Sequence, residues 1–135
     1  MRILALDWGT VRIGAAISDP DGKIAFPVDK FIDQKTAVDE IKIMVEDLNV
    51  EKILIGLPKS LTGQEGSSSK KVEAFVHEIK REVICPVELI DERFSSVHAG
   101  QKLAESGISE KDQRGLKDNL AAQIILQQYL DTKNN

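Results

Sequence analysis

The sequence predicts an α/β protein built on a five-stranded mixed sheet, an antiparallel meander followed by parallel strands, with helices on both faces. Three β-like segments separated by tight turns occupy the first 31 residues. Helix-like and strand-like segments then alternate up to residue 91, and the rest of the chain is helical in pattern. Strands separated by helices are typically parallel and joined by right-handed crossovers.

The meander is expected to use strands at residues 2–8, 13–18 and 23–31. The first contains Ile-Leu-Ala-Leu at residues 3–6, an apolar run typical of a buried strand. Gly9 permits a tight turn after it. Residues 19–22 read Asp-Pro-Asp-Gly, where proline presets one dihedral angle and glycine supplies a positive φ. Pro27 lacks an N–H group, so the third strand should lie at an edge of the sheet.

The later helices and strands are predicted from the spacing of apolar residues and from the Gly, Ser and Thr residues that interrupt it. Apolar residues spaced three and four apart predict a helix over residues 36–48, and an unbroken apolar run predicts a strand over 52–57. A loop rich in Ser, Thr and Gly should span residues 60–69, before a helix that ends near Val83. We expect the remaining elements to be a strand at 87–91, a helix from Ser95 or Ser96 to Gly107, and a last helix from about Leu116 to Leu130.

Acidic residues stand at the ends of two expected strands. Asp7 follows the first strand, and Asp91 and Glu92 close the fifth. The carboxyl ends of parallel strands meet at one edge of a sheet, where open α/β sheets bind their ligands. Asp91 and Glu92 are adjacent, so on an extended strand they point to opposite faces and only one should reach the site. These acids also have structural interpretations. Asp7 could start an Asx turn, and Asp91 or Glu92 could form an ion pair with Arg93 at the end of the fifth strand.

Asp118 could join these acids from the last helix. In the first turn of that helix the dipole would favour an acid without any function. Ala121 and Ala122 are small, however, and would let the helix pack close to the sheet and carry Asp118 toward the strand ends. An oxygen-only cluster of this kind suits Mg²⁺ or Mn²⁺. Two such ions roughly 4 Å apart can activate water and stabilise the leaving oxygen in phosphodiester hydrolysis.

Composition bounds the other possibilities. A chain of 135 residues, of which 41% are hydrophobic and 30% charged, is expected to be a single domain, residues 1–135. It has no apolar run long enough to cross a membrane and no signal peptide, so a cytoplasmic protein is expected. The net charge of −4 is unlike that of a typical nucleic-acid binder, but a local basic face can still bind phosphates. The spacing of the one cysteine and the two histidines matches no metal-binding or nucleophile motif. We therefore expect Cys85, His77 and His98 to be structural or exposed.

Four short motifs together resemble the YqgF (RuvX) family. They begin with Asp-Trp-Gly-Thr-Val-Arg-Ile-Gly at residues 7–14 and Gly-Leu-Pro-Lys at residues 56–59, the latter followed by Gly63 and Gly66. The other two are Asp-Glu-Arg-Phe-Ser-Ser at residues 91–96 and Lys-Asp at residues 117–118, followed by small and apolar residues. Their order and intervals fit the family over nearly the whole chain.

This resemblance implies an RNase H-like fold and a metal-dependent nuclease. It implies that Asp7, Glu92 and Asp118 are the catalytic, metal-binding acids, with Asp91 as a further candidate ligand of Mg²⁺ or Mn²⁺. Lys59, Lys70, Lys71 and Arg93 flank the expected site and are predicted to bind nucleic acid. The chain departs from the family pattern at Trp8, where Tyr or Phe is usual, and at residues 67–69, where Ser-Ser-Ser replaces Pro-Arg.

The resemblance leaves the substrate and the assembly open. It implies processing of the 5′ end of pre-16S rRNA during ribosome biogenesis, with a Holliday junction resolvase-like DNA endonuclease as the alternative. The protein could be a monomer or a homodimer, and a junction resolvase would require a two-fold dimer. The Asp-x-Gly-Thr motif at residues 7–10 also resembles the phosphate loop of actin-like ATP-binding proteins, which need two such domains. A non-catalytic RNA-binding factor of ribosome assembly is the remaining possibility.

Overall fold

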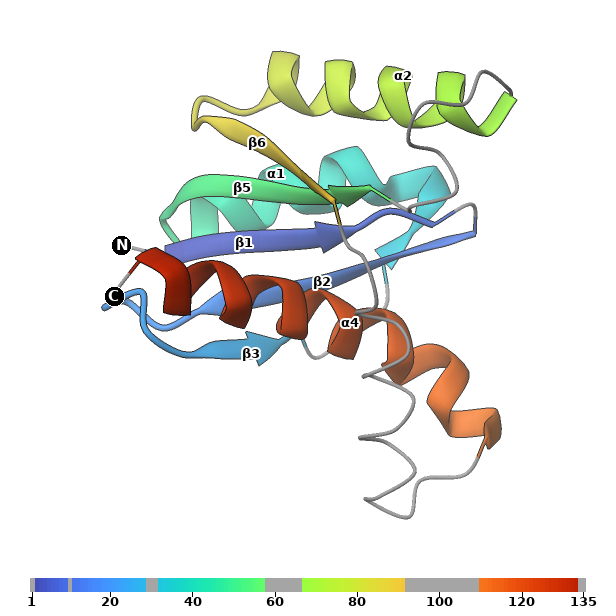
Figure 1. The fold of residues 1–135 in the computed structure, drawn as a ribbon. Coiled ribbons are helices and arrows are strands. Elements are labelled where there is room, and N and C mark those ends of the chain that lie inside the picture. The colour runs from blue at the N-terminus through green and yellow to red at the C-terminus, as the bar shows by residue number, and fades with distance from the viewer. Residues whose placement is uncertain (1, 10, 29–31, 58–66, 92–109, 134–135) are drawn as a thin grey trace.

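The computed structural model describes residues 2–9, 11–28, 32–57, 67–91 and 110–133, and of residues 67–69, 91 and 110–118 it describes the backbone alone. The strands are β1 (Arg2–Asp7), β2 (Arg12–Ser18), β3 (Ala25–Pro27), β4 (Ile32–Asp33), β5 (Val50–Leu57) and β6 (Val87–Asp91). The helices are α1 (Ala37–Asp47), which follows a 3-10 turn at Gln34–Thr36, α2 (Ser67–Glu82) and α4 (Glu110–Lys133) (Figure 1).

The described strands form a mixed sheet in the order β3-β2-β1-β5-β6 (Figure 1). β1, β2 and β3 are antiparallel neighbours, whereas β5 is parallel to both β1 and β6. The predicted meander followed by parallel strands is therefore confirmed, and β3, which contains Pro27, lies at an edge as expected.

The third strand differs from the prediction. It covers only Ala25–Pro27 rather than residues 23–31, and a short additional strand, β4, pairs with β2 at Ile13 and Ile32. The edge strand is short, and α4 satisfies the backbone of its first residue: Gln127 Oε1 accepts a hydrogen bond from Ala25 N at 2.9 Å, and Gln123 Nε2 donates to Ala25 O at 3.0 Å. The helix thus covers part of an edge that could otherwise pair with another chain.

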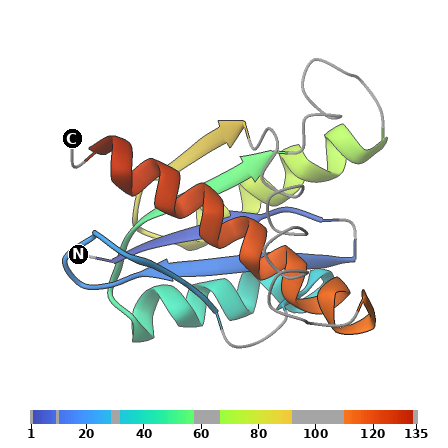
Figure 2. The same ribbon diagram turned by 60° about the horizontal axis from the view of Figure 1, so that its bottom comes forward.

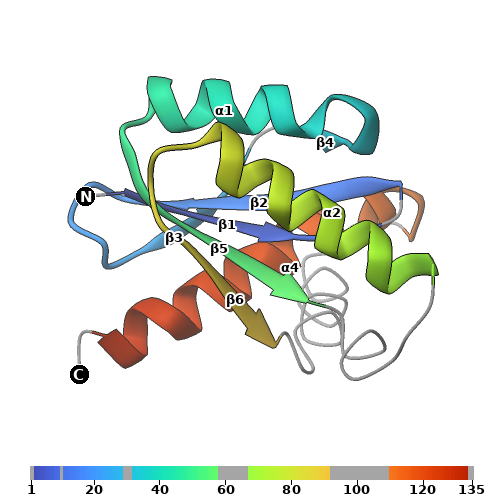
Figure 3. The same ribbon diagram turned by 90° about the horizontal axis from the view of Figure 1, so that it is seen from above.

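Alternation along β1 gives the two faces of the sheet separate cores. Leu4, Leu6 and Trp8 pack with residues of α1 and α2, whereas Ala5 packs with Ala122 of α4. Figure 3 shows α1 and α2 over one face and α4 beneath the other. The predicted coverage of both faces by helices is confirmed, and the small side chains beneath α4 allow it to lie close to the sheet.

The last helix begins earlier than predicted. α4 starts at Glu110 rather than near Leu116, and Gly115 lies within it. A single glycine destabilises a helix by only about 1 kcal/mol, which neighbouring residues can offset. Asp118 is consequently about two turns inside α4. The helix dipole acts within the first turn, so it does not account for an acid at this position.

The turn between β2 and β3 has the predicted chemistry. Gly22 has a φ of 70° and its N–H donates to Asp19 O at 3.0 Å. Asp19 Oδ1 accepts hydrogen bonds from Ile24 N at 3.0 Å and Lys23 N at 2.7 Å. The bond from Ile24, and then that from Lys23, hold the pKa of Asp19 below its ordinary value of 3.8.

This turn predicts a dependence of stability on pH. A carboxyl group with a lowered pKa in the folded state stabilises that state above its unfolded pKa, and the contribution is lost as the pH falls through the folded pKa. We expect Asp19→Asn to be less stable than the wild type near neutral pH, with the difference shrinking below the ordinary value of 3.8. Urea unfolding across this range measures it. Asp21→Asn, in the same turn, is the control, and a difference independent of pH would contradict the assignment.

Candidate active site

Asp7 lies at the carboxyl end of β1, between two glycines of the neighbouring strands. Asp7 is half-buried and pairs with Gly14 of β2 on one side and Gly56 of β5 on the other. Directly paired residues of neighbouring strands present their side chains to the same face. Because both of these paired residues are glycines, neither of them places a side chain beside this carboxylate. Ile3 and Ala5, which share the alternation of Asp7, pack in the cluster beneath α4, so Asp7 belongs to that face.

α4 is fixed to the sheet next to this position by a buried amide. Ala15 N donates to Asn119 Oδ1 at 2.8 Å, and Asn119 Nδ2 donates to Val28 O at 2.8 Å. Asn119 is 2% exposed. Ala15 pairs with Leu6, the residue before Asp7, so these bonds hold the backbone of this part of α4 near the end of β1. Figure 2 shows α4 crossing the sheet diagonally.

The fifth expected strand reaches the same edge. Ile90 of β6 pairs with Gly56 and is therefore level with Asp7, and Asp91 pairs with Leu57. Ile90 packs against the cluster beneath α4, on the same face as Asp7. The backbones of Asp91 and Asp118 are described and their side chains are not, and Glu92 lies outside the described residues.

The turn after Asp7 is held by Gly9 and Gln34. A Cβ atom on Gly9 would overlap the carbonyl oxygen of Arg12, so close approach of the backbone requires glycine here. Gln34 Nε2 donates to Gly9 O at 2.6 Å, and Gln34 N donates to Val11 O at 3.1 Å. Neither Gln34 nor Asn119 was singled out from the sequence, because only the folded chain brings their amides to these backbone groups.

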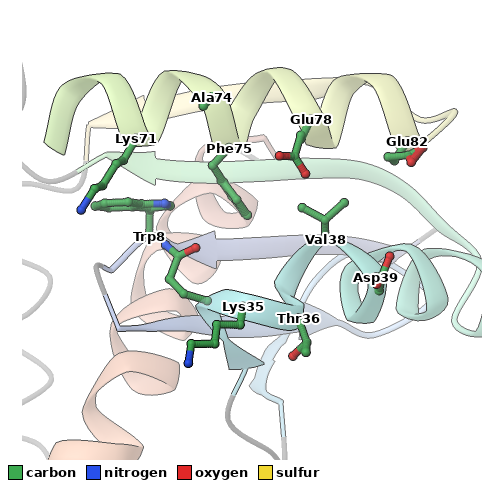
Figure 4. A pocket seen from close by; sticks show the side chains of 11 residues that line it. Trp8, Lys35, Thr36, Val38, Asp39, Lys71, Ala74, Phe75, Glu78 and Glu82 are labelled. Atoms are coloured by element: carbon green, nitrogen blue, oxygen red, sulfur yellow. The ribbon is translucent and has the colours of Figure 1, made fainter. Parts of the chain in front are cut away.

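Two of the four predicted nucleic-acid contacts are described. Lys70 and Lys71 are exposed near the start of α2, and Lys71 lines a cavity together with Trp8, the residue after Asp7 (Figure 4). The predicted contacts Lys59 and Arg93 lie outside the described residues.

Other predictions concern groups without a role in the site. His77 is exposed, as expected, and His98 lies outside the described residues. Cys85 is a half-buried free thiol, and burial raises its pKa, which disfavours the reactive thiolate. Within the described ranges, no group of three or more His, Cys, Asp or Glu side chains could hold a metal ion, and no described helix is long and apolar enough to span a membrane.

Comparison with known proteins decides the family. Residues 1–132 match the RuvX family, described as Holliday junction resolvase. The chain belongs to the RuvX family. The resemblance expected from the four motifs is thereby confirmed.

Relatives in this family are similar over nearly their full length. A protein of Dictyoglomus turgidum is 42% identical over 134 residues, covering 98% of this chain and 95% of the relative. One of Streptomyces avermitilis is 43% identical over 135 residues, covering 98% of this chain and 86% of the relative. Both carry the name "Putative pre-16S rRNA nuclease".

Two solved structures with a similar fold are those of resolvases. The Fowlpox virus resolvase, in complex with substrate Holliday junction DNA, matches with a TM-score of 0.59 at 15% identity, covering 100% of both chains. RuvC of T. thermophilus, in complex with a Holliday junction substrate, matches with a TM-score of 0.59 at 13% identity, covering 100% of this chain and 96% of the other. These similarities confirm the predicted RNase H-like fold.

Proposed function

We propose that this protein is a metal-dependent nuclease that hydrolyses phosphodiester bonds at the 5′ end of pre-16S rRNA during ribosome biogenesis in the cytoplasm. The observation that carries the proposal is the position of Asp7 in a chain of the RuvX family: a half-buried carboxylate at the carboxyl edge of the sheet, with a glycine on each side. The names of the relatives from D. turgidum and S. avermitilis support pre-16S rRNA as the substrate.

In this proposal Asp7, Glu92 and Asp118 are the catalytic acids and hold Mg²⁺ or Mn²⁺. The glycines paired with Asp7 add no side chains beside its carboxylate, and carboxylate oxygens are the donors that such hard cations prefer. The buried bonds of Asn119 hold α4 close to β1, which favours Asp118 as a second ligand. Because Ile90 shares the face of Asp7 and residues two apart share a face of an extended chain, Glu92 is favoured over Asp91 as the third.

The chemistry divides between the ions and the protein. Bound divalent ions would supply an activated water and charge stabilisation at the leaving oxygen. Asp7 would present its carboxylate at the end of β1, and the hydrogen bonds from Gln34 to Gly9 O and Val11 O would help to hold the turn that follows it. Lys70 and Lys71, on the neighbouring helix, would position the nucleic acid by contacting phosphates that are not cleaved.

A Holliday junction is the second candidate substrate. It is favoured by the description of the matching family and by the fold shared with resolvases solved with junction DNA. Metal ions held by carboxylates can promote hydrolysis of an RNA or a DNA backbone, so the chemistry of Asp7 does not distinguish the two.

The proposal is tested by cleavage assays with purified protein. The substrates are a 16S rRNA precursor that carries its 5′ leader, a mature 16S 5′ end and a four-way DNA junction, each with Mg²⁺, Mn²⁺ or EDTA. We expect metal-dependent cleavage of the precursor and none of the mature end. Cleavage of the junction alone would replace the RNA substrate with the second candidate. Absence of cleavage on both would contradict the enzymatic proposal and favour a non-catalytic RNA-binding role.

The two lysines of α2 give a quantitative prediction about binding. If both contact phosphates, the double variant Lys70→Ala/Lys71→Ala should bind RNA more weakly, and the slope of log affinity against log salt should fall by roughly one unit per lysine. Fluorescence anisotropy at several salt concentrations in EDTA measures this. The control is Lys80→Ala/Arg81→Ala, which removes two exposed cations from the last turn of the same helix. Equal slopes for the two double variants would show that Lys70 and Lys71 do not contact the RNA.

A further inference from the structure

Arg12 is the second charged residue of the motif at residues 7–14, and the proposed mechanism gives a role only to the first, Asp7. Arg12 begins β2, directly after the turn that connects this strand to β1. Its side chain is half-buried. The position of this guanidinium relative to Asp7 therefore decides whether it can reach a substrate bound at the carboxyl edge of the sheet.

Alternation along β2 places Arg12 on the same face of the sheet as Asp7. Ile13 packs with residues of α1 and α2 on one face, whereas Ala16 packs in the cluster beneath α4 on the other. Residues an even number of positions apart on a strand share a face, so Arg12 lies on the face of Ala16. Asp7 pairs with Gly14 and belongs to this face as well.

The same register brings the two charged residues close together. Arg12 is two residues from Gly14, the direct partner of Asp7, and is therefore a diagonal neighbour of Asp7 across the two strands. Diagonal neighbours lie about 7–8 Å apart, a separation that long side chains can span. Because Gly14 has no side chain, the guanidinium can extend toward the space beside the carboxylate.

The backbone that carries Arg12 is held firmly at this edge. Gly9 approaches Arg12 so closely that a Cβ atom on Gly9 would overlap the carbonyl oxygen of Arg12. Gln34 Nε2 donates to Gly9 O at 2.6 Å, and Gln34 N donates to Val11 O at 3.1 Å. These contacts fix both sides of the turn, so Arg12 extends from a defined backbone position next to Asp7.

The acid paired with Arg12 on its other side has a structural use. Asp33 of β4 pairs with Arg12, and its Oδ1 accepts a hydrogen bond from Lys35 N at 2.9 Å in the turn before α1. Asp33 is exposed, and ion pairs at exposed carboxylates contribute little free energy. Proximity to Asp33 would therefore not prevent the guanidinium from binding another anion.

We propose that Arg12 binds the phosphate adjacent to the one that is cleaved. The inference rests on the proposed nuclease function and deepens it. A guanidinium presents parallel N–H donors that match two phosphate oxygens. Asp7 and the metal ions would hold the scissile phosphate while Arg12 fixes the register of the strand, because phosphate contacts position a nucleic acid without reading its sequence.

Removing single charges from the substrate tests this contact. The precursor is assembled with a synthetic segment across the cleaved bond, in which either adjacent phosphate is replaced by an uncharged methylphosphonate on a deoxynucleotide; the reference carries the same deoxynucleotide with a normal phosphate. We expect the wild type to lose at least about tenfold in kcat/KM at one of these positions, as loss of a charge-assisted hydrogen bond predicts. Arg12→Ala should cleave the reference more slowly but lose less than about twofold on modification, because groups that contact each other are not additive.

Two further variants separate this contact from effects of charge and folding. Arg12→Lys keeps the charge without the parallel donors, so it should recover part of the sensitivity to the methylphosphonate. Arg2→Ala removes a cation from the amino end of β1 and should be as sensitive as the wild type. A purely structural role of Arg12 would lower the melting temperature of Arg12→Ala and leave its sensitivity intact. That result, or insensitivity of the wild type at both positions, would overturn the proposal.

The outcomes also distinguish this inference from the proposed function. Cleavage by the wild type without any phosphate whose effect depends on Arg12 would refute the contact and leave the nuclease proposal standing. If the wild type cleaves no strand, anisotropy in EDTA gives the affinities of the same strands. A methylphosphonate that weakens binding by the wild type but not by Arg12→Ala would then support the phosphate contact and refute the nuclease. Equal effects on both proteins would refute both.

Discussion

Asp7→Asn is expected to remove nearly all nuclease activity while leaving the protein folded. The substitution keeps the size of the side chain but removes the charge that would hold the metal ions. Loss of an outer-shell partner of a metal ligand already lowers metal affinity or activity roughly 10–100-fold, so loss of a ligand itself should lower cleavage by more than about 100-fold. Cleavage of the 16S precursor in Mg²⁺ and in Mn²⁺ measures the effect.

Stability distinguishes this role from a structural one. If Asp7 repels other carboxylates in the metal-free protein, its neutralisation should preserve or raise the melting temperature in EDTA. Mn²⁺ should stabilise the wild type, because an ion that binds only the folded state raises its stability, and should stabilise Asp7→Asn less. Asp47→Asn, which changes an exposed acid at the end of α1, is the control. Cleavage by Asp7→Asn at the wild-type rate would refute the mechanism.

The sequence predicted most of the elements at this edge because their signals are local. Apolar runs marked β1 and β5, the Asp-Pro-Asp-Gly turn fixed the hairpin at residues 19–22, and Pro27 identified an edge strand. Asp7 was recognisable because a carboxylate that directly follows a buried strand requires an explanation.

The errors arose where tertiary contacts outweigh local preference. Gly115 lies inside α4 despite its low helix propensity. The two residues of β4 form a strand only because they pair with β2. The importance of Gly14 and Gly56 emerged only from the register, which sets both beside Asp7. The cavity next to Trp8 was equally hidden, since it joins residues from α1 and α2 that are distant in sequence.

Asn119 illustrates this limit, and it provides the second large effect that we expect. In the sequence Asn119 is one of many polar residues of this helix, so nothing local marks it out. In the fold its amide bonds to Ala15 N and Val28 O, so one side chain connects α4 to β2 and to the segment after β3. Asn119→Ala would leave the buried N–H of Ala15 and the partly buried carbonyl of Val28 without these bonds. A buried group that loses its partner destabilises a protein by about 1–3 kcal/mol, so we expect a total loss of roughly 2–4 kcal/mol in urea unfolding.

The same change should affect catalysis, because Asn119 adjoins Asp118 and fixes the helix that carries it. At temperatures where the variant is fully folded, cleavage should fall at least about tenfold, in line with the loss of other groups that orient metal ligands. Gln123→Ala is the matched control: it removes one amide bond to Ala25 O from the next turn of α4. This control should lose only about 1 kcal/mol and retain its cleavage rate. If Asn119→Ala loses stability but cleaves like the control, the amide supports the fold without positioning Asp118.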